Sequence, residues 1–230
     1  MLARQQGELL CCRIAKLPAI GKSMKTIAIL SQKGGTGKTT LTLHLAVAAE
    51  MAGHPTVVID LDPQASASGW KDSRADEAPA VVSVPATRLP QAVQAAQEGG
   101  AGLVLIDTAP HSESASLAAA RAADLVLIPC RPGILDLRAI GTSAELARIA
   151  GKKAYVVLNA MPPRATHLAA DAREAVATHG LEVAPIMMQQ RAAYGHALTA
   201  GQTAQEFEPD GKGAEEIGQL FHWLAKNLAI

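Results

Sequence analysis

Residues 26–40 read TIAILSQKGGTGKTT, an apolar run followed by a glycine-rich loop and two threonines. The run Thr26–Ser31 predicts a buried strand, and Thr39–Ala52 has the apolar spacing of a helix that Gly53 would end. A glycine-rich loop that joins a strand to a helix is the context of a phosphate-binding loop, or P-loop. This stretch therefore predicts a nucleotide-binding α/β fold.

The loop departs from the usual P-loop pattern, G-x-x-x-x-G-K-[ST], at its first position. Gly37, Lys38 and Thr39 complete the pattern, but Gln32 stands where the first glycine belongs, and Lys33 adds a second lysine. The first glycine serves the geometry of the turn, so its replacement changes the class of loop without removing the phosphate contacts. A glycine turn with no ligand is disfavoured, because G-K-T-T follows a strand.

Most of the nucleotide-binding candidates lie in this loop. Glycines let backbone N–H groups turn toward phosphate oxygens, and the N-terminus of the helix adds a favourable dipole. We expect Lys38 to reach the β- and γ-phosphates and the hydroxyl of Thr39 to bind Mg²⁺. The candidates are Lys33, Gly34, Gly35, Thr36, Gly37, Lys38, Thr39 and Thr40, with Asn159 from a later strand.

Three carboxylates follow predicted strands. Asp60 and Asp62 lie in D-L-D-P-Q after the strand Thr56–Ile59, and Asp107 follows the uninterrupted apolar run L-V-L-I. Ligands of α/β sheets bind at the carboxyl ends of the strands, where carboxylates can order the water around Mg²⁺ or the attacking water. Each aspartate could instead cap a turn or helix, but the P-loop upstream favours a magnesium site.

Asn159 ends another predicted strand, Ala154–Leu158. Its amide could bind the edge of a nucleobase, or it could simply stabilise a turn, and the residues favour neither. The chain has no N-K-x-D sequence, so nothing supports selectivity for guanine.

Strand-like and helix-like segments alternate along the rest of the chain, which is typical of a parallel sheet with helices on both faces. We therefore predict a single-domain α/β P-loop NTPase fold over residues 24–230. Further strands are expected at 80–84, 103–106, 125–128, 154–158 and 182–186, helices at 89–97, 114–122, 136–150, 167–179, 192–200 and 213–228, a short helix near Trp70 and a surface loop at 206–213.

Composition narrows the functional classes. The 21 basic and 21 acidic residues cancel, so the chain does not coat nucleic acid by bulk charge, although a local patch remains open. Cys11, Cys12 and Cys130 form no C-x-x-C pair, which fits a reducing cytoplasm and predicts neither zinc nor disulfides. No stretch approaches the ~18 apolar residues of a membrane span. Residues 1–23 are expected to be a disordered extension or an over-extended start.

The motifs K-G-G-T-G-K-T-T, D-L-D-P-Q and L-I-D-T-A-P together resemble those of deviant-Walker ATPases of the ParA/MinD type. The chain looks most similar to small ParA partition ATPases without an N-terminal helix-turn-helix domain, from Met24 to the end. The resemblance implies that Lys33 is the signature lysine, which crosses to the partner's phosphates in an ATP-sandwich dimer. It also implies catalytic roles for Lys33, Lys38 and Asp62, of which Asp62 would position the attacking water. Asp60 would lie near Mg²⁺, with Thr39 and Asp107.

The resemblance further implies a cycle of ATP and Mg²⁺ binding, homodimerisation or higher assembly, and binding to non-specific DNA. A ParB-like centromere-binding protein would then stimulate hydrolysis, and the protein would associate with the bacterial nucleoid. The DNA-binding candidates are Arg164, Arg173 and Arg191, which are scattered and accompanied by acidic neighbours.

Two other classes of function stay open. A MinD-like spatial regulator, or a relative that moves a cargo other than DNA, would share these motifs. A MinD-like membrane helix would be basic and amphipathic, whereas Gly213–Leu228 has Lys226 as its one base and contains Glu215 and Glu216, so we expect it to pack on the core without anchoring the protein to a membrane. A metallocluster reductase would need two suitably placed cysteines, and an amide-forming synthetase would need a substrate pocket that the sequence does not reveal.

Overall fold

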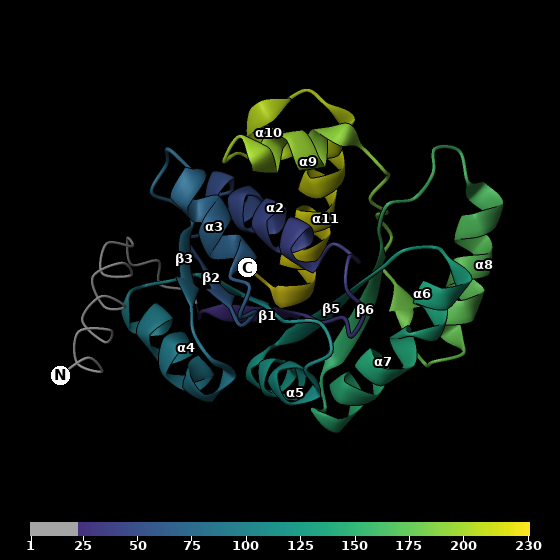
Figure 1. Ribbon diagram of the computed structural model, residues 1–230, viewed down its shortest axis with the longest axis horizontal. Helices are drawn as coiled ribbons and strands as arrows, with labels where there is room; N and C mark the ends of the chain where they lie inside the picture. Colours follow the sequence, from purple (N-terminus) through teal and green to yellow (C-terminus); the bar gives the residue numbers. More distant parts are fainter. Residues whose placement is uncertain (1–22) are drawn as a thin grey trace.

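A seven-stranded sheet in the order β3-β2-β4-β1-β5-β6-β7 forms the centre of the computed structural model, which describes residues 23–230 (Figure 1). Every neighbouring pair of strands is parallel. The central strands are buried along their length, as uninterrupted apolar runs require. The predicted fold is confirmed, while the extension expected over residues 1–23 lies outside the described residues, apart from Ser23.

The strands and helices have the following bounds. The strands are β1 Lys25–Ile29, β2 Thr56–Asp60, β3 Ala80–Ser83, β4 Leu103–Asp107, β5 Leu125–Cys130, β6 Lys153–Leu158 and β7 Glu182–Val183. The helices are α2 Lys38–Met51, α3 Ser66–Ser73, α4 Leu89–Glu98 after the 3₁₀ turn η1 Ala86–Arg88, α5 Glu113–Ala122, α6 Ile134–Arg138, α7 Ile140–Ile149, α8 Thr166–Ala177, α9 Ala192–Thr199, α10 Ala204–Phe207 and α11 Lys212–Leu228.

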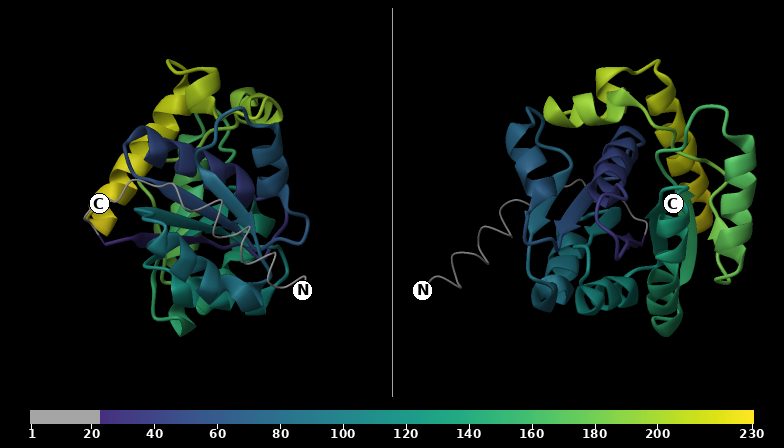
Figure 2. Two further views of the ribbon diagram at one scale, coloured as in Figure 1. Left: turned by 90° about the vertical axis from the view of Figure 1, so that its left-hand side faces the viewer. Right: turned by 45° about the vertical axis from the view of Figure 1, so that its right-hand side comes forward.

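Helices cover both faces of the sheet. Figure 1 shows α4, α5, α7 and α8 on one side and α2, α3, α9, α10 and α11 on the other, and each side has its own buried apolar cluster. The cores consist mainly of Ala, Val, Leu and Ile, as expected from a chain with 3% aromatic residues. Both views in Figure 2 show α9 and α10 at the end of the layer that contains α2 and α3.

The last helix, α11, belongs to the core. Its buried face carries Ile217, Leu220, Phe221, Leu224 and Leu228, and it packs against α2. This arrangement agrees with the expected core-packing helix. Among residues 23–230, no helix has both the length and the apolar composition that crossing a bilayer requires.

Two sequence predictions about local structure were wrong. The helix expected at 136–150 is divided into α6 and α7 at Ala139. The surface loop expected at 206–213 contains the end of α10 and the start of α11. Thr203 and Glu206 form a reciprocal capping box that starts α10, because each side chain satisfies a backbone N–H at the helix start.

The register of the sheet brings the predicted site residues together. Asp60 and Asp107 pair across β2 and β4, and Ile29, the last residue of β1 before the P-loop, pairs with Asp107 across β1 and β4. The carboxyl ends of three adjacent strands therefore meet at one edge, where α/β folds bind ligands.

Candidate nucleotide-binding site

The P-loop has the open backbone that phosphate binding requires. Gly35 and Gly37 have φ values of +71° and +93°, which side chains rarely adopt. A Cβ added to Gly34 or Gly35 would meet nothing within 4 Å, so this part of the loop is open to a ligand. Gly37 precedes the first residue of α2, and the N-terminus of that helix points its free N–H groups toward the loop.

Asn159 holds the P-loop from the end of β6. Its Nδ2 donates to the carbonyl of Thr36 at 2.7 Å, and its Oδ1 accepts from the N–H of Ala160 at 2.8 Å. A Cβ on Gly37 would lie 2.2 Å from the same Nδ2, so Gly37 is needed for this contact as well as for its φ. The structure thus shows a supporting contact for Asn159, and contact with a nucleobase stays a prediction.

Lys38 is held beneath the loop with 7% of its surface exposed. Its Nζ donates to the carbonyl of Lys33 at 3.3 Å. Burial lowers the pKa of this ammonium, while Asp107 and Asp62 oppose the shift. The side chain is therefore oriented before any ligand binds, in a position where an anion would replace a weak hydrogen bond.

Asp107 is the most perturbed carboxyl of the site. The hydroxyl of Thr39 donates to its Oδ2 at 2.6 Å, but its Oδ1 has no hydrogen-bond partner among the described residues, and the residue is 1% exposed. Burial, reinforced by Asp60 and Asp62, raises its pKa to about 7, although Thr39 and Lys38 act in the opposite direction. A buried oxygen without a partner is costly and indicates a position made for a ligand, an ion or water.

Mg²⁺ fits the donors at this position. The hydroxyl of Thr39 and the carboxylate of Asp107 are hard oxygen ligands in contact with each other, as Mg²⁺ prefers. Within residues 23–230, no group of three or more His, Cys, Asp or Glu side chains could hold a metal alone. A magnesium ion here would therefore take its other ligands from phosphate and water, which is its usual behaviour in nucleotide sites.

Asp60 and Asp62 form a loop with an internal scaffold. Asp60 is fully buried, and its two oxygens accept from the N–H of Asp62 at 2.9 Å and of Ala67 at 3.1 Å. Burial raises the pKa of Asp60 more than these hydrogen bonds lower it. Asp62 is half-buried and accepts from the N–H of Gln64 at 2.9 Å. Asp60 is thus placed to shape the loop, and Asp62 is the more accessible carboxylate.

Lys33 forms an ion pair that the sequence did not reveal. Its Nζ lies 2.9 Å from Oδ1 of Asp136 in α6, with 39% of the Lys33 side chain and 13% of the Asp136 side chain exposed. Ile134 and Leu135, immediately before Asp136, are among the most exposed large apolar residues of the described chain. The second lysine of the loop therefore lies beside an exposed apolar segment and is restrained by its own chain. The expected start of a helix near Leu135 was the available signal for Asp136, but it did not specify the partner.

Gln32, at the position of the missing first glycine, links the loop to α5. Its Nε2 donates to the hydroxyl of the buried Ser116 at 3.2 Å, and its carbonyl accepts from the N–H of His111 at 3.2 Å. A hollow of about 550 Å³ opens beside it, lined by Gln32, His111, Ser112, Glu113, Ser114 and Thr142. The segment 111–114, which follows β4, thus borders the P-loop.

The structure divides the three DNA-binding candidates. Arg164 and Arg173 are exposed, at a loop and on α8. Arg191 is instead half-buried in an ion pair with Glu216 and also donates to Gln189 at 3.2 Å. Its guanidinium is committed to joining the start of α9 to α11. We therefore withdraw Arg191 as a DNA-contact candidate.

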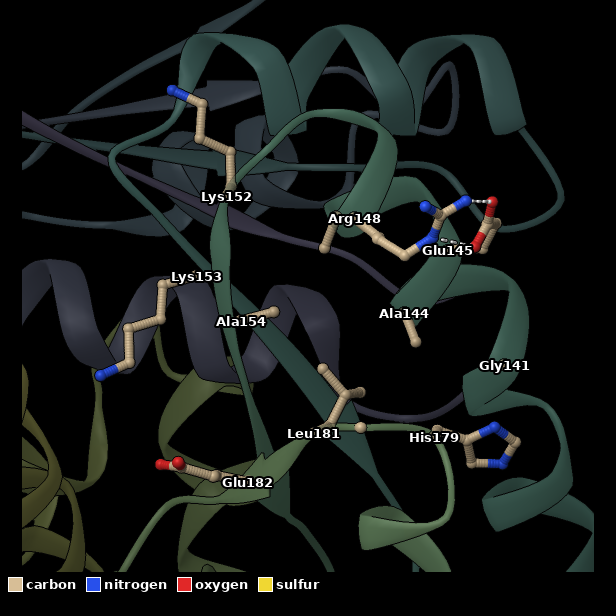
Figure 3. Close-up of a pocket in the computed structure, with 12 residues that line it drawn as sticks. Gly141, Ala144, Glu145, Arg148, Lys152, Lys153, Ala154, His179, Leu181 and Glu182 are labelled. Carbon is tan, nitrogen blue, oxygen red and sulfur yellow. Dashed lines mark hydrogen bonds and ion pairs between the residues drawn. The ribbon is translucent and has the colours of Figure 1, made fainter.

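A second hollow, of about 500 Å³, lies near the other ends of the strands (Figure 3). Figure 3 shows that its cationic side chains point in different directions, and that Arg148 is paired with Glu145. It is lined by residues from α7 and from the first residues of β6 and β7, far from the carboxyl ends of the strands. Its position and divergent charges do not fit a nucleotide site.

Comparison with known proteins decides the family. A model described as the CobQ/CobB/MinD/ParA nucleotide binding domain matches residues 27–204, which include the P-loop and all three aspartates. The chain belongs to this family. Its membership confirms the resemblance to the ParA/MinD type, and the nucleotide binding domain named by the family contains the site described above.

Two relatives with similar sequences are named for the distribution of carboxysomes and for the partitioning of chromosomes. The chain is 31% identical over 207 residues to "maintenance of carboxysome distribution protein A" of Gloeobacter kilaueensis, covering 89% of this chain and 94% of that protein. It is 26% identical over 233 residues to the "chromosome-partitioning ATPase Soj" of Thermus thermophilus, covering 86% and 94%.

The fold of the family is also found in solved structures. The septum site-determining protein MinD of Pyrococcus horikoshii, solved with Mg-ADP, superposes with a TM-score of 0.72 at 19% identity, covering 90% of this chain and 98% of that one. At this identity the likeness shows a shared fold, and the chemistry of this chain must be argued from its own residues.

Proposed function

We propose that this chain is a magnesium-dependent ATPase that uses ATP-driven dimerisation to position a cellular cargo along DNA. The observation that carries the proposal is the meeting of the P-loop with Asp60, Asp62 and Asp107 at one sheet edge, beside an exposed second lysine, Lys33. The groups that would donate hydrogen bonds to phosphate, the magnesium position and the lysine that would reach a second subunit then share one surface.

The P-loop would hold the phosphates of ATP. Its backbone N–H groups and Lys38 supply positive charge, and Asn159 keeps the loop in shape through the carbonyl of Thr36. Thr39 and Asp107 would hold Mg²⁺ with water, and Asp60 would support the adjacent loop. A magnesium ion held there would supply charge neutralisation for the phosphates.

Asp62 would orient the attacking water. It is the most accessible of the three carboxylates and lies in a loop braced by Asp60. Phosphoryl transfer depends mainly on positioning and on stabilisation of charge, so an accessible carboxylate near two lysines can supply the first while Lys38 and Lys33 supply the second. This arrangement supports hydrolysis of ATP to ADP and phosphate.

The position of Lys33 supports the dimerisation proposed here. Its half-exposed side chain is paired with Asp136, which directly follows the exposed Ile134 and Leu135 in the chain. A second copy could bury this apolar segment and receive Lys33 at its phosphates. The loss of the Asp136 pair would then be offset by contact with a more highly charged partner.

DNA binding and a ParB-like partner form the next step of the proposed cycle. Exposed Arg164 and Arg173 remain as candidates for phosphate contacts, and doubling them in a dimer would strengthen binding to non-specific DNA and place the protein at the nucleoid. The partner would stimulate hydrolysis and release. The chromosome-partitioning function in the name of the Thermus relative supports DNA as the cargo.

A second candidate is movement of a cargo other than DNA. The 31% identity with a protein named for carboxysome distribution favours it, since that relative covers nearly the whole chain. Both candidates share the same ATPase cycle and DNA track, and they differ in what the partner protein binds. In a deletion strain, unstable inheritance of a replicon would support DNA as cargo, whereas normal inheritance with mislocalised protein bodies would support the other.

The experiment that tests the shared cycle measures ATP hydrolysis and binding to random DNA over a range of salt concentrations. We expect DNA binding with MgATP, little with MgADP, and weakening as salt rises because counterions are released. Lys38→Ala should bind nucleotide at least ~100-fold more weakly, whereas Asp62→Ala should bind ATP without turning it over. Absence of ATP-dependent DNA binding would refute the DNA track, and normal hydrolysis by the Asp62 variant would refute the role of Asp62.

A further inference from the structure

We propose that Arg74 is a positioning residue that fixes the Asp60–Asp62 loop relative to the P-loop by anchoring α3 to α10 through Glu206. This inference rests on the ATPase function proposed above. It extends the site to the C-terminal part of the chain, where none of the sequence motifs lies.

Helix α3 connects the Asp60–Asp62 loop to Arg74. At its start, the N–H of Ala67 donates to Asp60, so the first turn of the helix is tied to the carboxylate loop. Arg74 follows its last residue. Because α3 has eight residues, a movement of its far end is transmitted over only ~12 Å to the loop.

Arg74 is almost completely enclosed at that far end. Its side chain is 5% exposed and its two terminal nitrogens bind both oxygens of Glu206, at 2.9 and 2.6 Å. It also donates to the carbonyls of Ala78 at 2.7 Å and Gly201 at 3.2 Å, and it lies 4.9 Å from the ring centre of Trp70. A planar guanidinium is needed to satisfy this set of acceptors, so a lysine could not replace it.

Two further contacts close the junction between α3 and the turn that links α9 to α10. Trp70 donates from its indole nitrogen to the carbonyl of Gln202 at 3.2 Å. Gly201 approaches the end of α3 so closely that a Cβ would lie 2.3 Å from the carbonyl oxygen of Ser73, and its φ is +69°. The contact is therefore tight on both sides of Arg74.

The same short helix, α10, also holds the helix that follows the P-loop. Gln205 is buried, and its Nε2 donates to the carbonyl of His44 in α2 at 2.9 Å. Glu206, the next residue, receives Arg74 and at the same time caps α10 through Thr203. Adjacent residues of α10 thus fix α2 and α3, whose first residues follow the P-loop and the Asp60–Asp62 loop.

The consequence concerns hydrolysis more than binding. The P-loop and Lys38 can hold a nucleotide whatever the position of α3, but the accessible carboxylate of Asp62 must be placed correctly relative to the phosphates. Small errors in the placement of a reacting group reduce the rate strongly, while the ground-state contacts are kept.

The test compares two arginine variants that each lose a partly buried ion pair with a glutamate. Arg74→Gln removes the pair with Glu206, and the control, Arg191→Gln, removes the pair with Glu216 between α9 and α11. For Arg74→Gln we expect kcat for ATP to fall about tenfold or more, with the Kd for MgADP changed less than about twofold. For Arg191→Gln we expect kcat per folded molecule to stay within about twofold, since this pair does not contact α3.

A milder variant covers the case in which Arg74→Gln does not fold. Trp70→Phe keeps an aromatic ring but loses the donor to Gln202, and it should lower kcat in the same direction with unchanged MgADP affinity. Wild-type kcat in a folded Arg74→Gln, or an equal loss in Arg191→Gln, would overturn the proposal. So would a normal kcat in Trp70→Phe if the arginine variant cannot be obtained.

A spectroscopic readout separates this inference from the ATPase proposal itself. In a Trp223→Phe background Trp70 is the one tryptophan of the chain, and its fluorescence should change when MgATP binds. We expect Arg74→Gln to abolish this change, because α3 is no longer joined to α10. If the wild-type chain binds but does not hydrolyse ATP, the ATPase proposal fails. The fluorescence response of Trp70 to MgATP then decides the inference. No response in the Trp223→Phe protein with Arg74 intact, or the same response in the protein that also carries Arg74→Gln, would overturn it.

Discussion

Replacing Asp107 with asparagine should stabilise the nucleotide-free protein at alkaline pH, even though it removes a carboxylate that we propose acts on Mg²⁺. The carboxyl is 1% exposed, and its pKa rises from 3.8 to about 7, mainly through burial. Since each pKa unit corresponds to ~1.4 kcal/mol, keeping this group ionised in the folded protein costs ~4 kcal/mol well above pH 7. The amide of asparagine has no such cost.

The sign of the pH dependence follows from proton binding. Between pH 4 and 7 the folded protein holds the Asp107 proton more tightly than the unfolded chain does, so stability contributed by this group falls as pH rises through that range. Asparagine does not titrate. The stability of Asp107→Asn relative to wild type should therefore increase by ~2–3 kcal/mol between pH 5 and pH 8.5. Relief of the repulsion with Asp60 acts in the same direction.

Urea unfolding at the two pH values, without nucleotide and Mg²⁺, measures this difference. Asp171→Asn, on the exposed face of α8, is the matched control and should stay within ~0.5 kcal/mol of wild type at both pH values. If the stability of Asp107→Asn relative to wild type is the same at pH 5 and pH 8.5, or smaller at pH 8.5, then burial does not disfavour ionisation of Asp107 and the account is refuted. With MgADP present the order should reverse, because ligand binding stabilises the wild type more.

Three other substitutions test separate contacts of the site. Lys38→Ala should weaken MgATP binding at least ~100-fold by calorimetry, since removing one partner of a buried charge arrangement costs ~3–5 kcal/mol; a loss below tenfold would contradict its role. Asp136→Asn should lower the concentration needed for ATP-dependent dimers by about five- to thirtyfold in light scattering, because each of the two half-exposed ion pairs to Lys33 in a dimer contributes ~0.5–1 kcal/mol. An unchanged threshold would show that the pair does not restrain Lys33. Asn159→Ala should lower the free energy of unfolding in urea by ~1 kcal/mol, because the hydrogen bond to Thr36 is lost, and should weaken nucleotide binding. If neither quantity changes, Asn159 does not support the loop.

The fold could be predicted because its signals are local. Strands β4 and β5 are almost entirely apolar, and the P-loop fixes a strand, a turn and a helix at once. The errors arose where local signals were weaker than packing. Nothing in the composition of 136–150 marks the break at Ala139, whereas the Thr203–Glu206 capping box was visible and was missed because the following residues, including Pro209, read as a loop.

The site could be predicted where motif residues follow strand ends, because parallel register brings those ends together. Lys38, Thr39 and Asp107 were predicted in this way, and the structure places Thr39 and Asp107 in contact. Partners supplied by distant segments were not found. Asp136 pairs with Lys33, and Ser116 binds Gln32 from 84 residues away. Neither contact follows a local spacing pattern, so the sequence alone does not predict it.

The longest-range contacts are those for which we propose an effect on rate. Arg74 and Glu206 are 132 residues apart, and Gln205 is 161 residues from His44, yet adjacent residues of α10 hold the helices that follow both halves of the site. Other chains with the same motifs are expected to share the chemistry of binding, because the P-loop and the aspartates are local. They need not share the same rate, because the relative placement of the two loops depends on C-terminal residues outside the motifs. A slow, partner-stimulated hydrolysis could therefore be set by a partner that shifts α9 and α10 without touching the phosphates.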